Sequence, residues 1–306
     1  MGRKGAIVAD PTAIGDVSSP PFVRLPDPIS LFSDRARRLR ALAETSDLAP
    51  YLTFLADLAQ AQHDVQSTLP PPVGPDAAAV MRAREFEMPP LLRNGTEGDE
   101  TTEFTFDRLF AAADEIEKPA AAAEALLRVR KADPAQRRSM MQAVFDGVLP
   151  DDVIAECIYV WAALQLHLAR LASGLDPSSL VPVAEGVVCP VCGGKPSSSM
   201  VVGWQGSHGA RFCTCSLCST LWHYVRIKCI LCGSTKGISY QEIEGQGGTV
   251  KAETCEECRG WSKIFYQTKD PAIDPVADDV ASLGLDLLMR ELHYRHGGFA
   301  PLLAGL

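Results

Sequence analysis

The sequence predicts an α+β protein with an N-terminal all-α helical domain, a tandem pair of small β modules and a C-terminal helix. Three observations predict this fold class. Apolar residues recur at intervals of three and four between residues 31 and 174, as on the buried face of a helix. Short strand-like runs separated by Gly, Pro and Ser fill residues 187–270. Paired cysteines occur only in that second region, and 306 residues exceed the usual length of one domain.

The first half is predicted to contain a series of helices separated by proline-rich segments. Residues 1–30 carry five prolines and no periodic pattern, so we expect an irregular lead-in there. Asp151 or Asp152 is expected to cap the strongest helix, whose long apolar stripe ends at Gly174. A final helix is expected at about 275–295, within the C-terminal segment 271–306. The helices expected before it lie at 31–44, 48–66, 76–87, 105–131 with a break at Pro119, from Pro134 onward, and 151–173.

Composition and charge disfavour several classes of protein. Acidic residues outnumber basic ones by 38 to 29, and the formal net charge of −9 disfavours a chain whose whole surface binds nucleic acid or anionic lipid. No run of about eighteen apolar residues occurs, so no membrane insertion is expected. The apolar patch near the N-terminus ends at Asp10 and is too short for a signal peptide. We therefore expect a cytoplasmic protein.

Eight of the ten cysteines form four CxxC pairs that follow a repeat. Each cysteine of the first two pairs is followed, the same number of residues further along the chain, by a cysteine of the other two pairs. Gly193 is followed by Gly233 at that same sequence offset. We interpret this pattern as an internal duplication, with one module at 187–228 and a second at 229–270. In a chain without an export signal, such pairs are typical of metal ligands.

Two CxxC pairs supply four thiolates, a set that binds one ion in tetrahedral geometry. We expect two metal ions, one per site, and the ligand set accepts either zinc or iron of the rubredoxin type. Cross-pairing between the repeats and thioredoxin-like redox pairs remain alternatives. Each module is therefore expected to be a rubredoxin-like or zinc-ribbon unit that folds around its metal. Pairing within each repeat predicts one site at Cys189, Cys192, Cys215 and Cys218 and another at Cys229, Cys232, Cys255 and Cys258.

Two further cysteines and two histidines are expected to play structural roles. Cys213 is predicted to be a half-buried strand residue, and a ligand-swap or redox role is the alternative. Cys157 is expected in the core. His208 should lie in an exposed turn, and His223 near the first site without ligating, because the thiolate set is already complete.

Two other clusters are weaker candidates for function. His293 and His296 are three residues apart on the predicted final helix and could chelate an ion, but no carboxylate or third ligand accompanies them. The arginines from Arg35 to Arg40 are interpreted as a solvent-exposed helix face. The usual enzyme motifs, such as a phosphate-binding glycine loop, a nucleophile elbow or HExxH, do not occur in the sequence. We therefore expect no enzymatic activity and assign no catalytic residue.

Several segments together carry a resemblance to a known family. In the cysteine-rich half they are 189–193, 198–201, 215–218, 222–229, 251–258, 263–267 and 269–271. The tail 276–283 with Asp286, and weaker motifs at 35–43 and 161–164, extend the match to roughly residues 28–290. These segments resemble the formate dehydrogenase formation protein, the FdhE family. Cys213 and Thr214 depart from the family pattern, which has an apolar residue and often His at these positions.

The resemblance implies a cytoplasmic, non-enzymatic accessory protein. Such proteins bind the catalytic subunit of a respiratory formate dehydrogenase during its maturation, through rubredoxin-like CxxC sites that can hold iron. Two other classes stay open. A nucleic-acid-binding zinc-ribbon protein would use Trp204, Trp222 and Trp261 as stacking platforms on a region with nine basic and six acidic residues. A rubredoxin-type electron carrier would need iron at a suitable potential. The sequence leaves the oligomeric state open.

Overall fold

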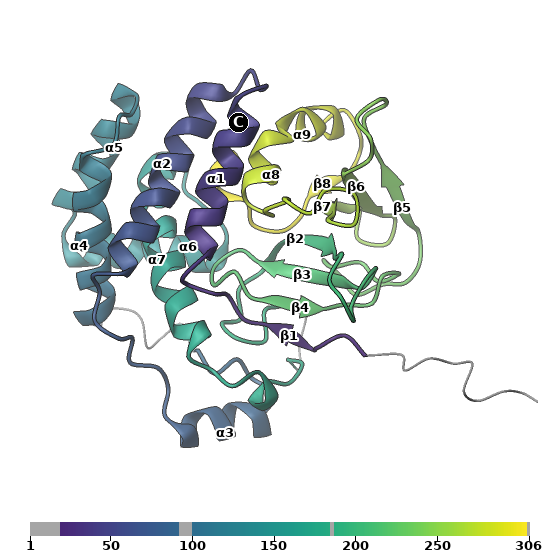
Figure 1. The fold of residues 1–306 in the computed structure, drawn as a ribbon, viewed down its shortest axis with the longest axis horizontal. Helices are drawn as coiled ribbons and strands as arrows, with labels where there is room; N and C mark the ends of the chain where they lie inside the picture. The colour runs from purple at the N-terminus through teal and green to yellow at the C-terminus, as the bar shows by residue number, and fades with distance from the viewer. Residues whose placement is uncertain (1–18, 92–99, 184–186, 305–306) are drawn as a thin grey trace, which may run out of the picture.

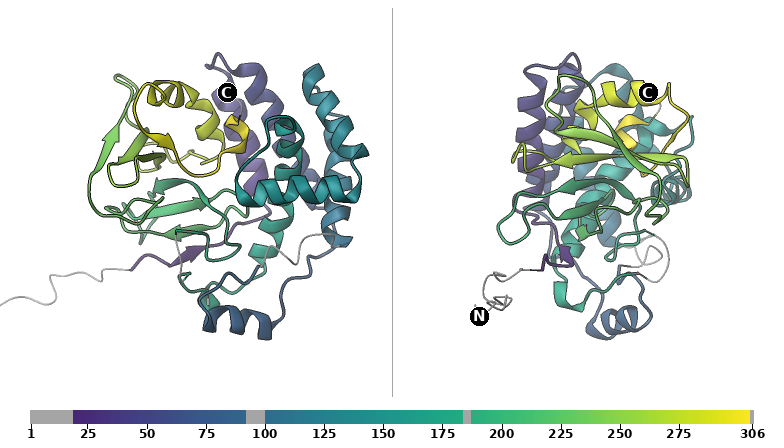
Figure 2. Two further views of the ribbon diagram at one scale, coloured as in Figure 1. Left: turned by 180° about the vertical axis from the view of Figure 1, so that it is seen from behind. Right: turned by 90° about the vertical axis from the view of Figure 1, so that its right-hand side faces the viewer.

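The computed structural model describes residues 19–91, 100–183 and 187–304. A group of helices from the first half lies beside a mixed β-sheet from the second half, and two short C-terminal helices lie between them (Figure 1). The predicted α+β class, with N-terminal helices, cysteine-rich strands and C-terminal helical structure, is confirmed. The view from behind shows the same two groups side by side (Figure 2, left).

The helices of the first half begin and end at residues that favour their termini. Asp133 accepts backbone hydrogen bonds from Ala135 and Gln136 in a capping box, and Gly147 ends that helix at a left-handed φ of 65°. Asp76 caps the third helix in a similar way. The helices are α1 (Leu31–Ala43), α2 (Ala49–Gln66), α3 (Ala77–Glu85), α4 (Glu100–Asp114), α5 (Ala120–Lys131), α6 (Pro134–Asp146) and α7 (Ile154–Ser173).

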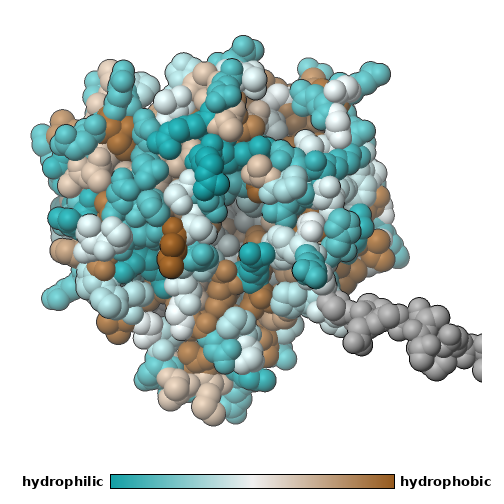
Figure 3. Space-filling view, in the orientation of Figure 1, coloured by the Kyte–Doolittle hydropathy of each residue, from teal (hydrophilic) through white to brown (hydrophobic). Residues whose placement is uncertain are grey.

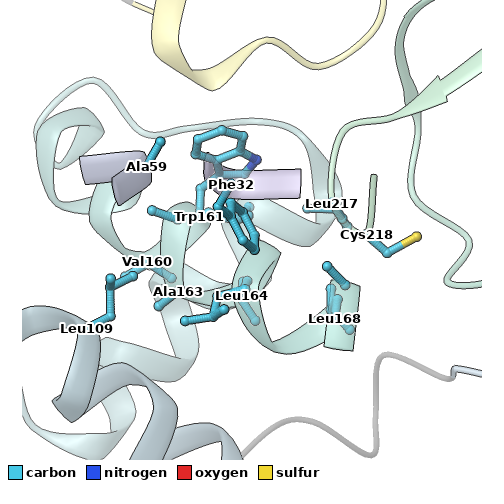
Figure 4. Packing of buried hydrophobic residues seen from close by; sticks show 14 of the residues in the cluster. Phe32, Ala59, Leu109, Val160, Trp161, Ala163, Leu164, Leu168, Leu217 and Cys218 are labelled. Carbon is cyan, nitrogen blue, oxygen red and sulfur yellow. The ribbon is translucent and has the colours of Figure 1, made fainter. Parts of the chain in front are cut away.

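Helix α7 is the centre of the helical group. It is apolar on nearly every face, as expected of a helix surrounded by others, and α2, α4, α5 and α6 all pack against it. Trp161 and Leu164 of α7 meet Phe32 of α1 in the core (Figure 4). The same hydrophobic cluster continues into the cysteine-rich half through Leu217 and Cys218. The two halves therefore share one core.

The strands form a single sheet in the order β1-β4-β3-β2-β7-β6-β5, with β8 also pairing with β7. Neighbours within each repeat are antiparallel, whereas β2 and β7 join the two repeats in parallel, with Ser199 opposite Ile264. The strands are β1 (Val23–Arg24), β2 (Pro196–Val201), β3 (Arg211–Cys215), β4 (Leu221–His223), β5 (Ile238–Gln241), β6 (Val250–Cys255), β7 (Gly260–Tyr266) and β8 (Arg295–His296).

The strands repeat with the same offset as the cysteines. Moving β3 by this offset gives 251–255, which lies within β6, and moving β4 gives 261–263, which lies within β7. The backbone repeats too, because Ser219 and its counterpart Arg259 both have positive φ, of 59° and 53°. The duplication read from the cysteine spacing therefore extends to the fold of the whole module.

Three expectations about element boundaries differ from the structure. The predicted helix at 275–295 is instead two short helices, α8 (Ala277–Ala281) and α9 (Leu283–Met289), followed by a turn and β8. The Ser282 hydroxyl donates to the backbone carbonyls of Asp278 and Asp279 at the junction between them. Within the predicted irregular lead-in, residues 23–24 form β1 against β4, while 1–18 lie outside the described residues. Helix α7 starts after Val153, without a side-chain cap from Asp151 or Asp152.

The interpretation of Arg35–Arg40 as a solvent-exposed face is wrong for two of its arginines. Arg35 is 4% exposed, and its Nε donates to Asp274 Oδ1 at 3.2 Å. Arg38 donates to Asp278 Oδ1 at 2.6 Å and to Asp270 Oδ2 at 2.8 Å. These pairs fasten α1 to the segment that begins α8. The sequence did not reveal them, because the carboxylates lie far away along the chain, near its C-terminal end.

Candidate metal centres

The structure brings the eight paired cysteines together as two groups of four. In each group one sulfur from every cysteine lies within 4.8 Å of the others. Cys189, Cys192, Cys215 and Cys218 form the first cluster, and Cys229, Cys232, Cys255 and Cys258 form the second. The grouping follows the predicted pairing within each repeat. It does not follow the alternative of cross-pairing between repeats.

Each cluster is built from one CxxC turn before a hairpin and one at the end of a strand. In the first, Cys189 and Cys192 precede β2, whereas Cys215 ends β3 and Cys218 lies in the turn after it. Gly193 and Gly233 follow the first turn of each repeat at φ values of 69° and 74°, a conformation that glycine adopts without strain. This turn lets the Gly193 N–H donate to the Cys189 carbonyl at 2.9 Å, and Gly233 repeats the bond to Cys229 at the same distance.

Backbone N–H groups also point at the sulfurs. Val191 N–H donates to Cys189 Sγ at 3.4 Å, and Leu231 N–H donates to Cys229 Sγ at 3.3 Å. In the second turn of the first cluster, the N–H groups of Leu217 and Cys218 donate to Cys215 Sγ, each at 3.4 Å. Hydrogen bonds of this kind stabilise sulfur in its negatively charged form and orient it as a ligand.

The distances between sulfurs fit a tetrahedral metal ion better than a disulfide. Facing sulfurs are 3.6 Å apart for Cys189 and Cys218 and 3.4 Å apart for Cys192 and Cys215. The matching pairs of the second cluster are 3.9 and 3.8 Å apart. A tetrahedral ion with metal–sulfur bonds of about 2.3 Å holds its ligands about 3.8 Å apart, whereas bonded sulfurs lie about 2.05 Å apart. Each cluster is therefore able to hold one metal ion.

Burial and contacts between the thiols shift the pKa values of several clustered cysteines. Burial raises the pKa of the Cys189 and Cys215 thiols well above the ordinary value. Hydrogen bonds from the other thiols of the cluster lower the pKa of Cys192. Burial likewise raises the pKa of Cys229 in the second cluster. Burial alone therefore favours neutral thiols, and four thiolates would be stable together only with a cation to compensate their charge.

The other predicted candidates lie outside the two clusters. Cys213 is fully buried in β3 rather than half-buried, and burial raises its pKa to about 12, so it stays a thiol. Cys157 is buried in α7, as predicted. His208 is exposed, as predicted, and the His223 ring packs edge-on against Phe212 at 5.7 Å. In this position burial lowers the pKa of His223.

His293 and His296 do not share a helix, contrary to the prediction. His293 lies in the turn after α9, and His296 lies in β8 with its ring 4.8 Å from that of Trp261. Among the described residues, neither histidine belongs to a group of three or more potential ligands. The helical spacing that motivated a chelating pair is therefore lost, because the chain leaves the helix at Arg290.

Sequence reasoning missed how the first cluster is attached to the helices. The backbone carbonyl of Ser216, between two of its cysteines, accepts hydrogen bonds from Trp161 Nε1 at 2.8 Å and Gln165 Nε2 at 3.5 Å. Leu217 and Cys218 lie beside Trp161 and Leu168 of α7 (Figure 4). A signal was present in the sequence, since Leu217 is apolar where its counterpart in the second repeat is Glu257.

Models of three FdhE domains together match nearly the whole described chain. The N-terminal domain of FdhE matches residues 20–185, the central domain residues 188–226 and the C-terminal domain residues 227–303. The first of these contains the helical half. Each of the other two contains one four-cysteine cluster.

Individual relatives agree with the domain matches. The chain is 50% identical to a protein FdhE homolog of Rhizobium meliloti (strain 1021), over 97% of both chains. It is 37% identical to a homolog from Edwardsiella ictaluri (strain 93-146), over 91% of this chain and 90% of that one. The crystal structure of the FdhE protein from Pseudomonas aeruginosa matches with a TM-score of 0.83 at 32% identity, over 93% of this chain and 99% of that chain. By sequence, domain order and fold, the chain belongs to the FdhE family.

Proposed function

We propose that this protein is a metal-binding accessory protein for formate dehydrogenase maturation, which binds the catalytic subunit of that enzyme during assembly. The observation that carries the proposal is the pair of four-cysteine clusters in a chain matched along nearly its whole length to FdhE. In this role each cluster holds one iron or zinc ion, and the protein acts in the cytoplasm by binding rather than by catalysis. The metal would fix the geometry of the module that meets the partner.

Two further features of the structure concern membrane crossing and the nucleic-acid-binding alternative. Within the described ranges, no helix combines the length and the apolar character needed to cross a membrane. Of the three tryptophans expected as stacking platforms, Trp222 and Trp261 are 4% and 3% exposed. Trp204 already lies under the Arg24 guanidinium at 4.2 Å. Stacking on nucleic-acid bases needs open aromatic faces, so these side chains do not favour that alternative.

A co-purification experiment tests the proposal. Affinity-tagged protein is expressed in cells that produce a respiratory formate dehydrogenase and lack their own FdhE protein. We expect the tagged chain to recover the catalytic subunit and to restore formate oxidation by the cells. Replacing both Cys229 and Cys232 with Ser should remove one metal equivalent and weaken recovery of the subunit, because the second module loses half of its ligands.

The matched control is Cys213→Ala, which removes a buried thiol that belongs to neither cluster. This variant should keep two metal equivalents and recover the subunit as the unaltered protein does. Failure of the unaltered protein to recover any formate dehydrogenase subunit would contradict the proposal. Unchanged metal content in the double cysteine variant would contradict the site assignment.

A further inference from the structure

We propose that the two clusters have different roles: the first is a permanent structural site, and the second is the exchangeable site at which the metal enters, leaves and meets outside ligands. This inference rests on the metal-binding part of the proposed function. It is independent of the partner that the protein binds.

Burial of the cysteines separates the clusters. All four cysteines of the first are buried, with at most 2% exposure. In the second, Cys229 and Cys255 are buried, Cys232 is exposed and Cys258 is partly exposed. The second cluster thus has one exposed and one partly exposed cysteine, whereas the first has neither. An incoming ligand can therefore approach a metal in the second cluster without any change in the fold.

The first cluster is covered by the helical half. On one side, Leu217 and Cys218 are packed against α7, and Ser216 is held by Trp161 (Figure 4). On the other side, the segment after α3 contacts the first CxxC turn, since Leu91 N–H donates to the Val191 carbonyl at 3.0 Å. Both contacts would have to open before a ligand could reach the first metal.

The second repeat has different residues at the positions that make these contacts. The counterparts of Ser216 and Leu217 are Glu256 and Glu257, which are both exposed. Val191 is fully buried, whereas its counterpart in the second repeat, Leu231, is partly exposed. In the second module, β5 forms the edge of the sheet that lies farthest from the N-terminal helices (Figure 1). The difference in burial therefore follows from the sequence of each repeat.

The step at the exchangeable site is ligand substitution. Cys229, Cys232, Cys255 and Cys258 would hold the ion, and an outside donor would take the place of Cys232 Sγ, which would keep both bonding electrons and take up a proton from water. No oxidant or reductant takes part. At the first cluster the same step requires prior opening of the contacts with α7. Opening these contacts costs free energy, so only a small fraction of the molecules is open at any time. Metal exchange at the first cluster therefore has a rate proportional to that fraction.

Chelator competition tests the proposal on the full chain. Protein loaded with zinc to two equivalents, as measured by elemental analysis, is mixed with excess 4-(2-pyridylazo)resorcinol, and zinc transfer is followed by absorbance. We expect one equivalent to leave at least about tenfold faster than the other. The Cys232→Ser variant should hold one equivalent, released only in the slow phase, with its helix content unchanged by circular dichroism.

The matched variant at the equivalent position of the first repeat is Cys192→Ser, which should lose its tertiary structure together with the slowly released equivalent. Because this variant can fail to fold, alkylation of the unaltered protein gives an independent measurement. N-ethylmaleimide should label Cys232 and Cys258 before any cysteine of the first cluster, as mapped by peptide mass.

Release of both equivalents at one rate, or earlier labelling of the first cluster, would overturn the asymmetry while leaving the proposed function intact. A protein that binds no zinc or iron at all would overturn this proposal and the metal-binding part of the proposed function together. If the protein bound both metal ions but failed to recover the formate dehydrogenase subunit, only the proposed function would be contradicted.

Discussion

Arg211 and Glu253 form a fully buried ion pair that ties the two modules together. Their side chains are 0% and 2% exposed, and Arg211 Nη2 donates to Glu253 Oε1 at 2.8 Å. Arg211 also donates to the carbonyl of Lys228, immediately before Cys229, at 3.0 Å, and to Ser199 Oγ at 3.0 Å. Arg211 therefore connects strand β3 of the first module to the start of the second cluster.

Removing this guanidinium should destabilise the protein strongly. In Arg211→Met the Glu253 carboxylate is left buried without its partner, so we expect the free energy of unfolding to fall by about 3–5 kcal/mol. Denaturant titration followed by circular dichroism measures this loss. The double variant Arg211→Met with Glu253→Leu should recover part of it, because no unpaired charge remains.

The repeat provides a matched control at Lys251, the counterpart of Arg211. Lys251 pairs with Glu242 at 2.7 Å, but its side chain is 23% exposed and that of Glu242 is 48% exposed. Lys251→Met should therefore change the free energy of unfolding by less than about 1 kcal/mol. If Arg211→Met and Lys251→Met lowered the free energy of unfolding equally, burial of the Arg211–Glu253 pair would not explain its contribution to stability.

For individual residues, the sequence predicted which cysteines form the two clusters, but it did not predict the buried ion pairs. The constant offset between the cysteine pairs identified all eight residues of the clusters, because ligand spacing is a local property of a turn. The partners of Arg35, Arg38 and Arg211 depend on which distant segments meet. No local pattern distinguishes Arg35 and Arg38 from the exposed Arg37 between them.

Among the elements, helices with a buried stripe were predicted well, whereas the end of the chain was not. Helix α7 was found within a few residues because its apolar residues recur along its whole length. The segment 275–295 has an apolar pattern too, but its acidic residues pair elsewhere. Asp278 contacts Arg38, while Asp279 and Asp286 contact the buried Lys263 of β7. These tertiary contacts hold α8 against α1 and both short helices against β7.

Helix α3 differs from the other helices of the first half because none of its residues is buried. It lies at one end of the molecule, away from the remaining helices (Figure 1). Apolar side chains come to the surface among polar ones in this region of the space-filling view (Figure 3), and Val73, Met81 and Phe86 are exposed there. Its contribution to the core is therefore small.

Two methionines on helices test this difference between elements. Met81 of α3 is 71% exposed, whereas Met141 of α6 is fully buried. Met141→Ala should lower the free energy of unfolding by about 2–5 kcal/mol, because it leaves a cavity in the core. Met81→Ala should change it by no more than about 0.5 kcal/mol. A large loss in Met81→Ala, measured by denaturant titration, would mean that α3 packs against the core in solution.

At the scale of the whole molecule, the sequence divided the chain into modules more sharply than the structure does. One hydrophobic cluster extends from Phe32 in α1 through Trp161 to Cys218 and on to Val280 in α8. One sheet contains both repeats, joined by β2 and β7. Pairing between strands of different repeats depends on long-range contacts, which the alternation within each strand does not encode.

This shared core predicts that the metal-loaded protein unfolds in a single cooperative transition. Arg38 contributes to the coupling, since it is 16% exposed and joins α1 to Asp270 and Asp278 of the C-terminal segment. Arg38→Ala leaves Asp278 nearly buried without its partner and should lower the free energy of unfolding by about 3 kcal/mol. The neighbouring Arg37, 75% exposed, is the control, and Arg37→Ala should have an effect below about 1 kcal/mol. Scanning calorimetry at a fixed metal concentration measures both effects. Two separate transitions in the unaltered protein would show that the helical half and the sheet unfold independently in spite of the hydrophobic cluster that they share.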